Sequence, residues 1–212
     1  MRLRDLEIQL QSLERITDHK VSLESYPTPA SIAAAIIYAA EMEHGDIVGK
    51  TVCDLGCGDG VFAIGAALLG ANHVIGIDLY SKALKAAKRN STQLGTEDTV
   101  NLVLGDVSSL TFRGHVDTVV SNPPFGVKKR GADIGFLKTA ISSAKVIYSI
   151  HLAGEKNRLY LKRIIERLGG TVTQIETFEF PIPKIYEFHR KAKHLTRVDL
   201  YRISTDECED NG

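Results

Sequence analysis

Four consecutive residues, Asn122-Pro123-Pro124-Phe125, follow the largely apolar run from Val116 to Ser121. This run predicts a buried strand, and the residues that follow such a strand reach the rim of the sheet. Proline has no backbone N–H, so the carbonyl groups of this segment have few neighbouring donors. An amide, two carbonyls and an aromatic ring therefore meet at one rim. This combination suits the recognition of a planar amino group.

The amino nitrogen of adenine N6, cytosine N4 or a side-chain amide is a poor nucleophile, because its lone pair is delocalised. Hydrogen bonds to the Asn122 side-chain oxygen and the Pro123 carbonyl would favour a pyramidal nitrogen whose lone pair points at an electrophile. Phe125 could then stack on a base that has left its helix. A proline-rich turn that ends in a core phenylalanine would have the same four residues, so the motif alone leaves both interpretations open.

A glycine-rich turn follows the strand predicted near Thr51 and precedes a helical stretch. Its glycines, Gly56, Gly58 and Gly60, permit positive φ and a close approach of backbone to a ligand. The spacing is G-x-G-x-G, with Asp54 two residues before the first glycine, whereas the dinucleotide fingerprint is G-x-G-x-x-G. An acidic residue beside the turn disfavours a pyrophosphate and suits a cation.

Two further strand ends carry acidic residues. Asp78 ends the strand that begins at His73, about 20 residues after the turn, where a carboxylate can accept hydrogen bonds from ribose hydroxyls. Asp106 and Val107 follow the strand Val100 to Leu104 and could bind an adenine amino group and a ring nitrogen. The three strand ends together fit a positively charged nucleoside, S-adenosylmethionine, better than a nicotinamide dinucleotide.

The chain resembles class I S-adenosylmethionine-dependent methyltransferases with an Asn-Pro-Pro-Phe motif. It is most similar to the archaeal and eukaryotic family that methylates adenine N6 in small-subunit ribosomal RNA. The resemblance extends from about residue 3 to about residue 203, and Ser25 stands where that family often has glutamine. The segments that carry it are Leu23 to Thr28, Asp54 to Gly58, Asn122 to Gly126 and Tyr186 to Lys191.

The resemblance implies roles for individual residues. The catalytic residues would be Asn122, Pro123, Pro124 and Phe125. The cofactor-binding residues would be Ser25, Thr28, Asp54, Gly56, Gly58, Asp59, Val61, Asp78, Leu79, Asp106, Val107 and Asn122. A small zinc-binding activator protein would extend one sheet edge; the apolar strand His73 to Ile77 and its neighbours support this, but also fit an ordinary core.

The order of predicted elements is typical of an α/β fold. Strands near residues 51, 73, 100, 116 and 145 alternate with helical stretches at 61–69, 81–94, 132–143 and 155–168, after helices at Leu3 to Thr17 and Ala30 to Glu43. This alternation predicts a parallel sheet with helices on both faces, and residues 171–180 and 197–204 would close it as an antiparallel pair. The expected architecture is Rossmann-like, a mostly parallel seven-stranded sheet with an antiparallel last strand.

Length and composition predict a single domain. The chain has 212 residues, of which 43% are hydrophobic and 25% charged, enough to bury a core without metals or disulfides. We expect one methyltransferase domain over residues 1–204, in which residues 1–29 form an N-terminal helix and a segment covering the cofactor. Residues 205–212 would be a disordered acidic tail.

No apolar segment is long enough to span a bilayer and no signal peptide is recognisable, which favours a cytoplasmic protein. Cys53 and Cys57 lack the spacing of a zinc site and are expected to pack in the core.

Basic residues cluster at two places, although the formal net charge is zero. They are Lys128, Lys129 and Arg130 after the motif, and His189, Arg190, Lys191 and Lys193 between the last two strands. Either cluster could bind RNA phosphates, or could be a solvated loop.

Two other functions stay open at this point: methylation of a protein glutamine, whose amide nitrogen poses the same chemical problem, and a cofactor-binding but inactive subunit. The basic clusters weigh against the first, and the intact motif with its acidic strand ends weighs against the second.

Overall fold

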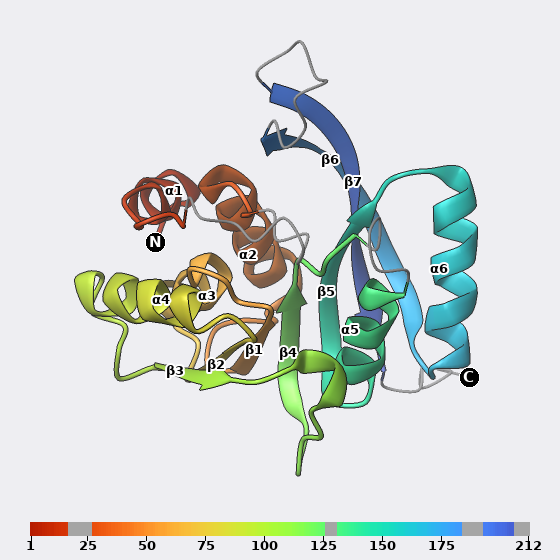
Figure 1. Cartoon of the computed structure of the whole chain (residues 1–212), viewed down its shortest axis with the longest axis horizontal. Helices are drawn as coiled ribbons and strands as arrows, with labels where there is room; N and C mark the ends of the chain where they lie inside the picture. Colours follow the sequence, from red (N-terminus) through yellow and green to blue (C-terminus); the bar gives the residue numbers. More distant parts are fainter. Residues whose placement is uncertain (17–26, 126–130, 184–192, 206–212) are drawn as a thin grey trace.

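A seven-stranded sheet forms the centre of the computed structural model (Figure 1). The model describes residues 1–16, 27–125, 131–183 and 193–205, with only the backbone for 181–183 and 193–195. The strand order is β3-β2-β1-β4-β5-β7-β6, and β7 runs antiparallel to β5 and β6 while the other pairs are parallel. This confirms the expected architecture. The strands are β1 (Thr51–Leu55), β2 (His73–Asp78), β3 (Val100–Leu104), β4 (Val116–Ser121), β5 (Ala144–Leu152), β6 (Thr171–Pro183) and β7 (Lys193–Ser204).

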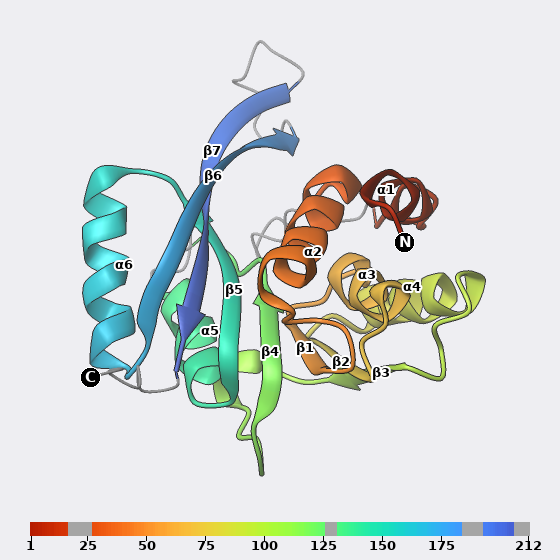
Figure 2. The same cartoon turned by 180° about the vertical axis from the view of Figure 1, so that it is seen from behind.

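Helices cover both faces of the sheet, and each face has its own core (Figure 2). On one face, α1, α2 and α3 bury Leu10, Ile37 and Ile64, with α4 beside α3. On the other face, α5 and α6 bury Leu137 and Leu161. The helices are α1 (Leu3–Gln11), α2 (Ala30–His44), α3 (Val61–Leu69), α4 (Ser81–Gln93), α5 (Ala132–Ile141) and α6 (Glu155–Arg167), with a short 3-10 turn η2 (Val107–Ser109). None of the helices within the described residues is long and apolar enough to cross a bilayer.

The first helix ends at Gln11, so the prediction that it continues to Thr17 was wrong. Ser12 Oγ donates to the carbonyl of Gln9 at 2.7 Å and closes the last turn. The Asn90 side chain then binds both the N–H and the carbonyl of Glu14, at 2.8 and 3.1 Å. A backbone held from outside in this way cannot continue the helical ladder.

The last two strands are longer than predicted, and their hairpin rises well beyond the rest of the sheet (Figure 1). The sequence predicted strands at 171–180 and 197–204, and β6 includes two prolines beyond Phe180. Their pairing continues, with Pro181 opposite Leu195 and Pro183 opposite Lys193. This is permitted because β6 is an edge strand, where a missing N–H can face away from the ladder.

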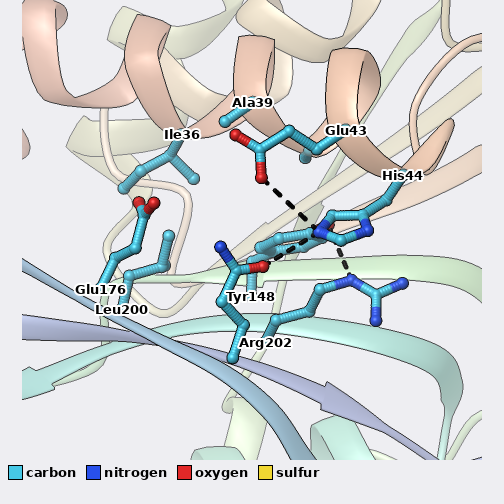
Figure 3. A pocket seen from close by; sticks show the side chains of 10 residues that line it. Ile36, Ala39, Glu43, His44, Tyr148, Glu176, Leu200 and Arg202 are labelled. Carbon is cyan, nitrogen blue, oxygen red and sulfur yellow. Dashed lines mark hydrogen bonds and ion pairs between the residues drawn. The ribbon is translucent and has the colours of Figure 1, made fainter.

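A small pocket lies between α2 and strands β5, β7 and β6 (Figure 3). It lies toward the amino ends of the parallel strands, since His44 ends α2 shortly before β1 begins. Next to it, Asp46 accepts hydrogen bonds from Tyr148 at 2.6 Å and from Arg202 at 3.0 Å. Both members of the Asp46–Arg202 ion pair are mostly buried. This network joins the loop before β1 to strands β5 and β7.

We expect Arg202→Met to destabilise the protein by about 3 kcal/mol, because Asp46 would lose a cationic partner while remaining largely buried. Urea denaturation measures the difference. Arg163→Met on the exposed side of α6 is the matched control, and it should change the free energy of unfolding by less than about 0.5 kcal/mol. Equal effects of the two substitutions would show that the Asp46–Arg202 pair contributes little.

Candidate active site

The carboxyl ends of β1, β2 and β4 bring the predicted site residues to one edge of the sheet. In the ladder Leu55 lies opposite Ile77 on one side and Ser121 on the other. Ser121 Oγ also donates to the Leu55 carbonyl at 3.0 Å. The glycine turn, the end of β2 and the Asn-Pro-Pro-Phe motif therefore start from neighbouring positions.

The glycine turn is bound directly to the end of β2. Gly56 and Cys57 donate their N–H groups to the Ile77 carbonyl at 2.8 and 2.9 Å. The Asp78 carboxylate accepts from Gly58 N–H at 2.8 Å and from Tyr80 N–H at 2.7 Å. A carboxylate offers about four acceptor positions. These two bonds fix its orientation and leave capacity for ligand hydroxyls.

All three glycines of the turn have the positive φ that the sequence predicted, with φ 89° at Gly60. Gly56 has φ 76° and Gly58 has φ 56°. A Cβ on Gly56 would lie 3.0 Å from the Phe136 ring, so a side chain there would have a strained backbone and would also require this ring to move. Gly58 has open space at the same position, and there only the conformation requires glycine.

Asp54 is buried under the turn, with an exposed fraction of 1%. Its Oδ2 accepts from Ala63 N–H at 3.0 Å, while Oδ1 has no hydrogen-bond partner within the described part of the chain. Burial, together with the nearby carboxylates of Asp78 and Asp59, raises the pKa of this carboxyl to about 8, although the Ala63 N–H acts to lower it. A positively charged ligand at this turn would relieve that unfavourable electrostatic environment.

The raised pKa of Asp54 predicts that the free energy of unfolding decreases as the pH rises. A carboxyl whose pKa is 3.8 in the unfolded chain and about 8 in the folded one binds more protons when folded, so stability decreases as pH rises between these values. From pH 7 to pH 8, Asp54 should account for about 1 kcal/mol of lost stability. Urea denaturation at the two pH values measures this loss. Asp54→Asn should remove it, and an unchanged slope in this variant would contradict the assignment.

The Asn122 amide is held by the segment that precedes α2. Asn122 Nδ2 donates to Thr28 Oγ1 at 3.0 Å, and Thr28 is 4% exposed. Pro123 is buried, and Asn122 is partly buried. The Phe125 ring meets Phe180 of β6 edge to face, with 6.3 Å between ring centroids. The motif is therefore held on one side by Thr28 and on the other by Phe180.

The residues expected to surround an adenine follow β2 and β3, the next two strands beyond β1 at this edge of the sheet. Asp106 is exposed, and its Oδ1 accepts from Ser108 N–H at 2.9 Å and from Ser108 Oγ at 2.6 Å, which caps η2. Val107 is buried against the sheet, and Leu79 is 57% exposed beside Asp78. Val61 is buried at the start of α3 and belongs to the core. The exposed Leu79 surface is where a flat apolar ring could pack.

Asp59 has a partner that the sequence did not reveal. Its carboxylate is 3.2 Å from Arg15 Nη1, and its carbonyl accepts from Asn90 Nδ2 at 2.9 Å. Neither Arg15 nor Asn90 belongs to a motif, and Arg15 is one of several charged residues in the N-terminal segment. A buried asparagine on the apolar side of α4 was the available signal, since such a residue needs partners.

Several predicted residues lie outside the described part of the chain: Ser25, Lys128, Lys129, Arg130, His189, Arg190 and Lys191. Lys193 lies within β7, where only the backbone is described. Their assigned contacts with cofactor and RNA stay predictions. Cys53 and Cys57 are both buried, as expected for packing residues.

The parallel sheet with its antiparallel β7, the glycine turn and the acidic strand ends define a Rossmann-like methyltransferase of class I. A crystal structure from Pyrococcus horikoshii, provisionally described as that of an RNA methyltransferase, superimposes with a TM-score of 0.87 and 38% identity, covering 96% of this chain and 98% of that one. The rRNA N(6)-adenosine-methyltransferase METTL5 of Danio rerio is 35% identical over 208 residues, which is 96% of this chain and 99% of the relative. The corresponding Drosophila melanogaster protein is 34% identical and covers 96% of each chain. The chain belongs to this METTL5 family of rRNA N6-adenosine methyltransferases.

A second match covers the part of the chain that contains the glycine turn. The family model of ribosomal protein L11 methyltransferase (PrmA) matches residues 36–123. This range runs from within α2 to Pro123, so it includes the glycine turn and the ends of β1 to β4 and stops before the β6–β7 hairpin.

Proposed function

We propose that this chain methylates the N6 amino group of one adenosine in small-subunit ribosomal RNA, with S-adenosylmethionine as the methyl donor. The observation that carries the proposal is the Asn122 amide, fixed by Thr28 at the carboxyl end of β4 beside the glycine turn. Membership of the METTL5 family supports adenine N6 as the acceptor. We further propose that residues 1–204 act as one domain and that the protein works in the cytoplasm.

The residues at the turn fit a cationic nucleoside cofactor. Asp54, Asp59 and Asp78 lie close enough to influence one another electrostatically, and Asp54 has an unsatisfied buried oxygen. Asp78 would hold the ribose, Asp106 and Val107 the adenine, and Gly56, Gly58 and Asp59 the methionine end. S-adenosylmethionine supplies an electrophilic methyl group and a positive charge to this acidic edge.

The catalytic work of the chain is to orient the target nitrogen. Because Asn122 Nδ2 donates to Thr28, the amide oxygen is the atom left to accept an N–H from the target. The Pro123 carbonyl would accept the second N–H, and both bonds favour a pyramidal nitrogen with its lone pair directed at the methyl group. Phe125 would stack on the flipped adenine. No general base is needed beforehand, because the nitrogen becomes acidic only once it is alkylated.

A labelling experiment tests the activity. The purified chain is incubated with tritium-labelled S-adenosylmethionine and either small-subunit RNA or ribosomal proteins, and the RNA is then digested to nucleosides. We expect label in N6-methyladenosine, and its loss with Asn122→Ala. Label in protein alone would favour the glutamine alternative or a function like that of the L11 methyltransferases. Label in neither would favour an inactive subunit or a missing partner.

RNA binding should depend on Lys128, Lys129 and Arg130. Changing all three to glutamate should weaken binding of small-subunit RNA and lower the slope of log K against log salt by about 2 to 3. Filter binding over a salt series measures both quantities. The same change at Lys156, Lys162 and Arg163 on the exposed side of α6 is the control, and an equal loss there would leave the first cluster without a special role.

A partner at the sheet edge is a further part of the proposal. Within the described residues β3 pairs only with β2, so its other side is an edge, and Val103 and Leu104 are 41% and 62% exposed there. Strand β2 is paired on both sides and accounts for the apolar run at His73 to Ile77 as core. A small zinc-binding activator, as the resemblance implies, would add to β3. An isolated chain that is monodisperse and fully active would contradict this.

A further inference from the structure

We propose that Arg15 is a positioning residue that connects the cofactor turn to the catalytic amide, acting on Asn122 through Thr28. This inference rests on the proposed function for its effect on turnover, but its geometry is independent of the substrate. The contacts that carry it run from α4 through Arg15 and Thr28 to the end of β4.

The first contacts fix the chain immediately before Arg15. Asn90 of α4 is fully buried and binds the backbone of Glu14 with both ends of its amide, at 2.8 and 3.1 Å. The Glu14 carboxylate accepts from Arg89 Nε at 2.8 Å and from Arg89 Nη2 at 2.7 Å. Asn90 Nδ2 also donates to the Asp59 carbonyl at 2.9 Å. The same buried amide therefore sets the positions of Arg15 and of the glycine turn.

The next contacts are made by the Arg15 guanidinium. Nη1 pairs with Asp59 Oδ1 at 3.2 Å, and Nη2 donates to the backbone carbonyl of Thr28. The Asp59 side chain is 6% exposed and that of Arg15 is 30% exposed, so the pair is largely shielded from water. The donors of a guanidinium lie in one rigid plane. Arg15 therefore fixes the distance between the turn and the segment before α2.

The last contact reaches the catalytic motif. Thr28 is bound at two places, since its carbonyl accepts from Arg15 and its Oγ1 accepts from Asn122 Nδ2 at 3.0 Å. The next residue, Pro29, precedes α2, and its carbonyl accepts from Ala33 N–H at 2.9 Å. Thr28 is thus held on the helix side by α2 and on the other side by Arg15. Within the described residues, the loss of Arg15 would leave Thr28 oriented by its connection to α2 and by its bond to Asn122.

The positive charge of Arg15 lies beside the acidic groups of the glycine turn. The carboxylates of Asp54, Asp59 and Asp78 gather at the turn, and Arg15 brings positive charge to them. A ligand that moved Asp59 would remove one of the two contacts that hold the guanidinium beside the Thr28 carbonyl. Arg15 could in this way transmit cofactor binding to the orientation of the Asn122 amide.

The test compares Arg15→Ala and Arg15→Lys with Arg2→Ala, which removes an exposed ion pair of the same N-terminal segment. We expect Arg15→Ala to lower kcat on RNA by about tenfold at saturating cofactor. The KM for RNA should change less than twofold and the melting temperature by only a few degrees. Arg15→Lys can keep one of the two contacts and should recover part of the rate, while Arg2→Ala should match the wild type. An unchanged kcat in Arg15→Ala overturns the inference.

Two further readouts separate positioning from a merely structural role. If Arg15 acts through Thr28, the effects of Arg15→Ala and Thr28→Val on kcat should not add, and additive effects overturn the inference. The NMR signal of the Asn122 side-chain amide, assigned by its loss in Asn122→Ala, should shift in Arg15→Ala and not in Arg2→Ala. If the wild type does not methylate RNA but the signal shifts in Arg15→Ala, the proposed function is contradicted and this inference is supported. If the wild type is active but the signal does not shift in Arg15→Ala, the proposed function is supported and this inference is overturned.

Discussion

Asn122→Ala is expected to lower kcat on small-subunit RNA by about 100- to 1,000-fold, the loss typical of removing one preorganised electrostatic contact from a transition state. The Asn122 oxygen would accept a hydrogen bond from the target amino group, and that bond strengthens as the nitrogen becomes pyramidal. The binding of S-adenosylhomocysteine should change much less, because the glycine turn, the proposed cofactor site, is built on β1 and β2. Single-turnover kinetics with labelled cofactor measures the rate, and calorimetry measures the binding.

The structure supplies a graded control for this prediction. Thr28→Val removes only the hydroxyl that accepts from Asn122 Nδ2, so the amide stays but loses one fixed orientation. Its rate should lie between those of the wild type and Asn122→Ala. Asn72→Ala, at an exposed site before β2, controls for the loss of an amide elsewhere. If Asn122→Ala lost cofactor binding and turnover in proportion, the residue would belong to the cofactor site rather than to catalysis.

The fold was predictable because the chain alternates apolar strands with amphipathic helices at regular intervals. The runs at Val52, Val74, Val119 and Ile147 are buried on both sides by helices, and such strands appear as continuous apolar segments. The ends of elements were less predictable where long-range contacts decide them. Asn90 ends α1 from a position 76 residues away from Glu14, and β6 tolerates its prolines only because it lies at an edge.

The site was predictable where local geometry requires a particular residue type. The glycine turn depends on positive φ, and the motif at Asn122 follows a strand whose end was visible in the sequence. The connection between the two was not predictable, because Arg15 and Thr28 meet only through the packing of α1 and α2 against α3. Residue spacing carries no information about a guanidinium that joins the glycine turn to the segment before α2.

Asp78→Ala is the second prediction with a large expected effect, a loss of about 100-fold in affinity for S-adenosylhomocysteine, as removal of two charge-assisted hydrogen bonds implies. Burial raises the pKa of this carboxyl, while the N–H groups of Tyr80 and Gly58 lower it and help keep it ionised. Calorimetry measures the affinity, and Asp98→Ala, at an exposed position, is the matched control. The substitution also removes the two backbone contacts of Asp78, so affinity alone does not show that the ribose is its ligand.

A cofactor analogue resolves that ambiguity. If Asp78 binds the ribose, the wild type should discriminate strongly against S-adenosylhomocysteine that lacks the 2′-hydroxyl, because the analogue leaves part of the carboxylate without its ligand. Asp78→Ala should bind the two compounds almost equally, since the partner of the missing hydroxyl is gone. If the variant instead kept the full discrimination while losing affinity, Asp78 would act by holding Gly58 and the turn in place. The ribose hydroxyls would then be recognised elsewhere on this edge of the sheet.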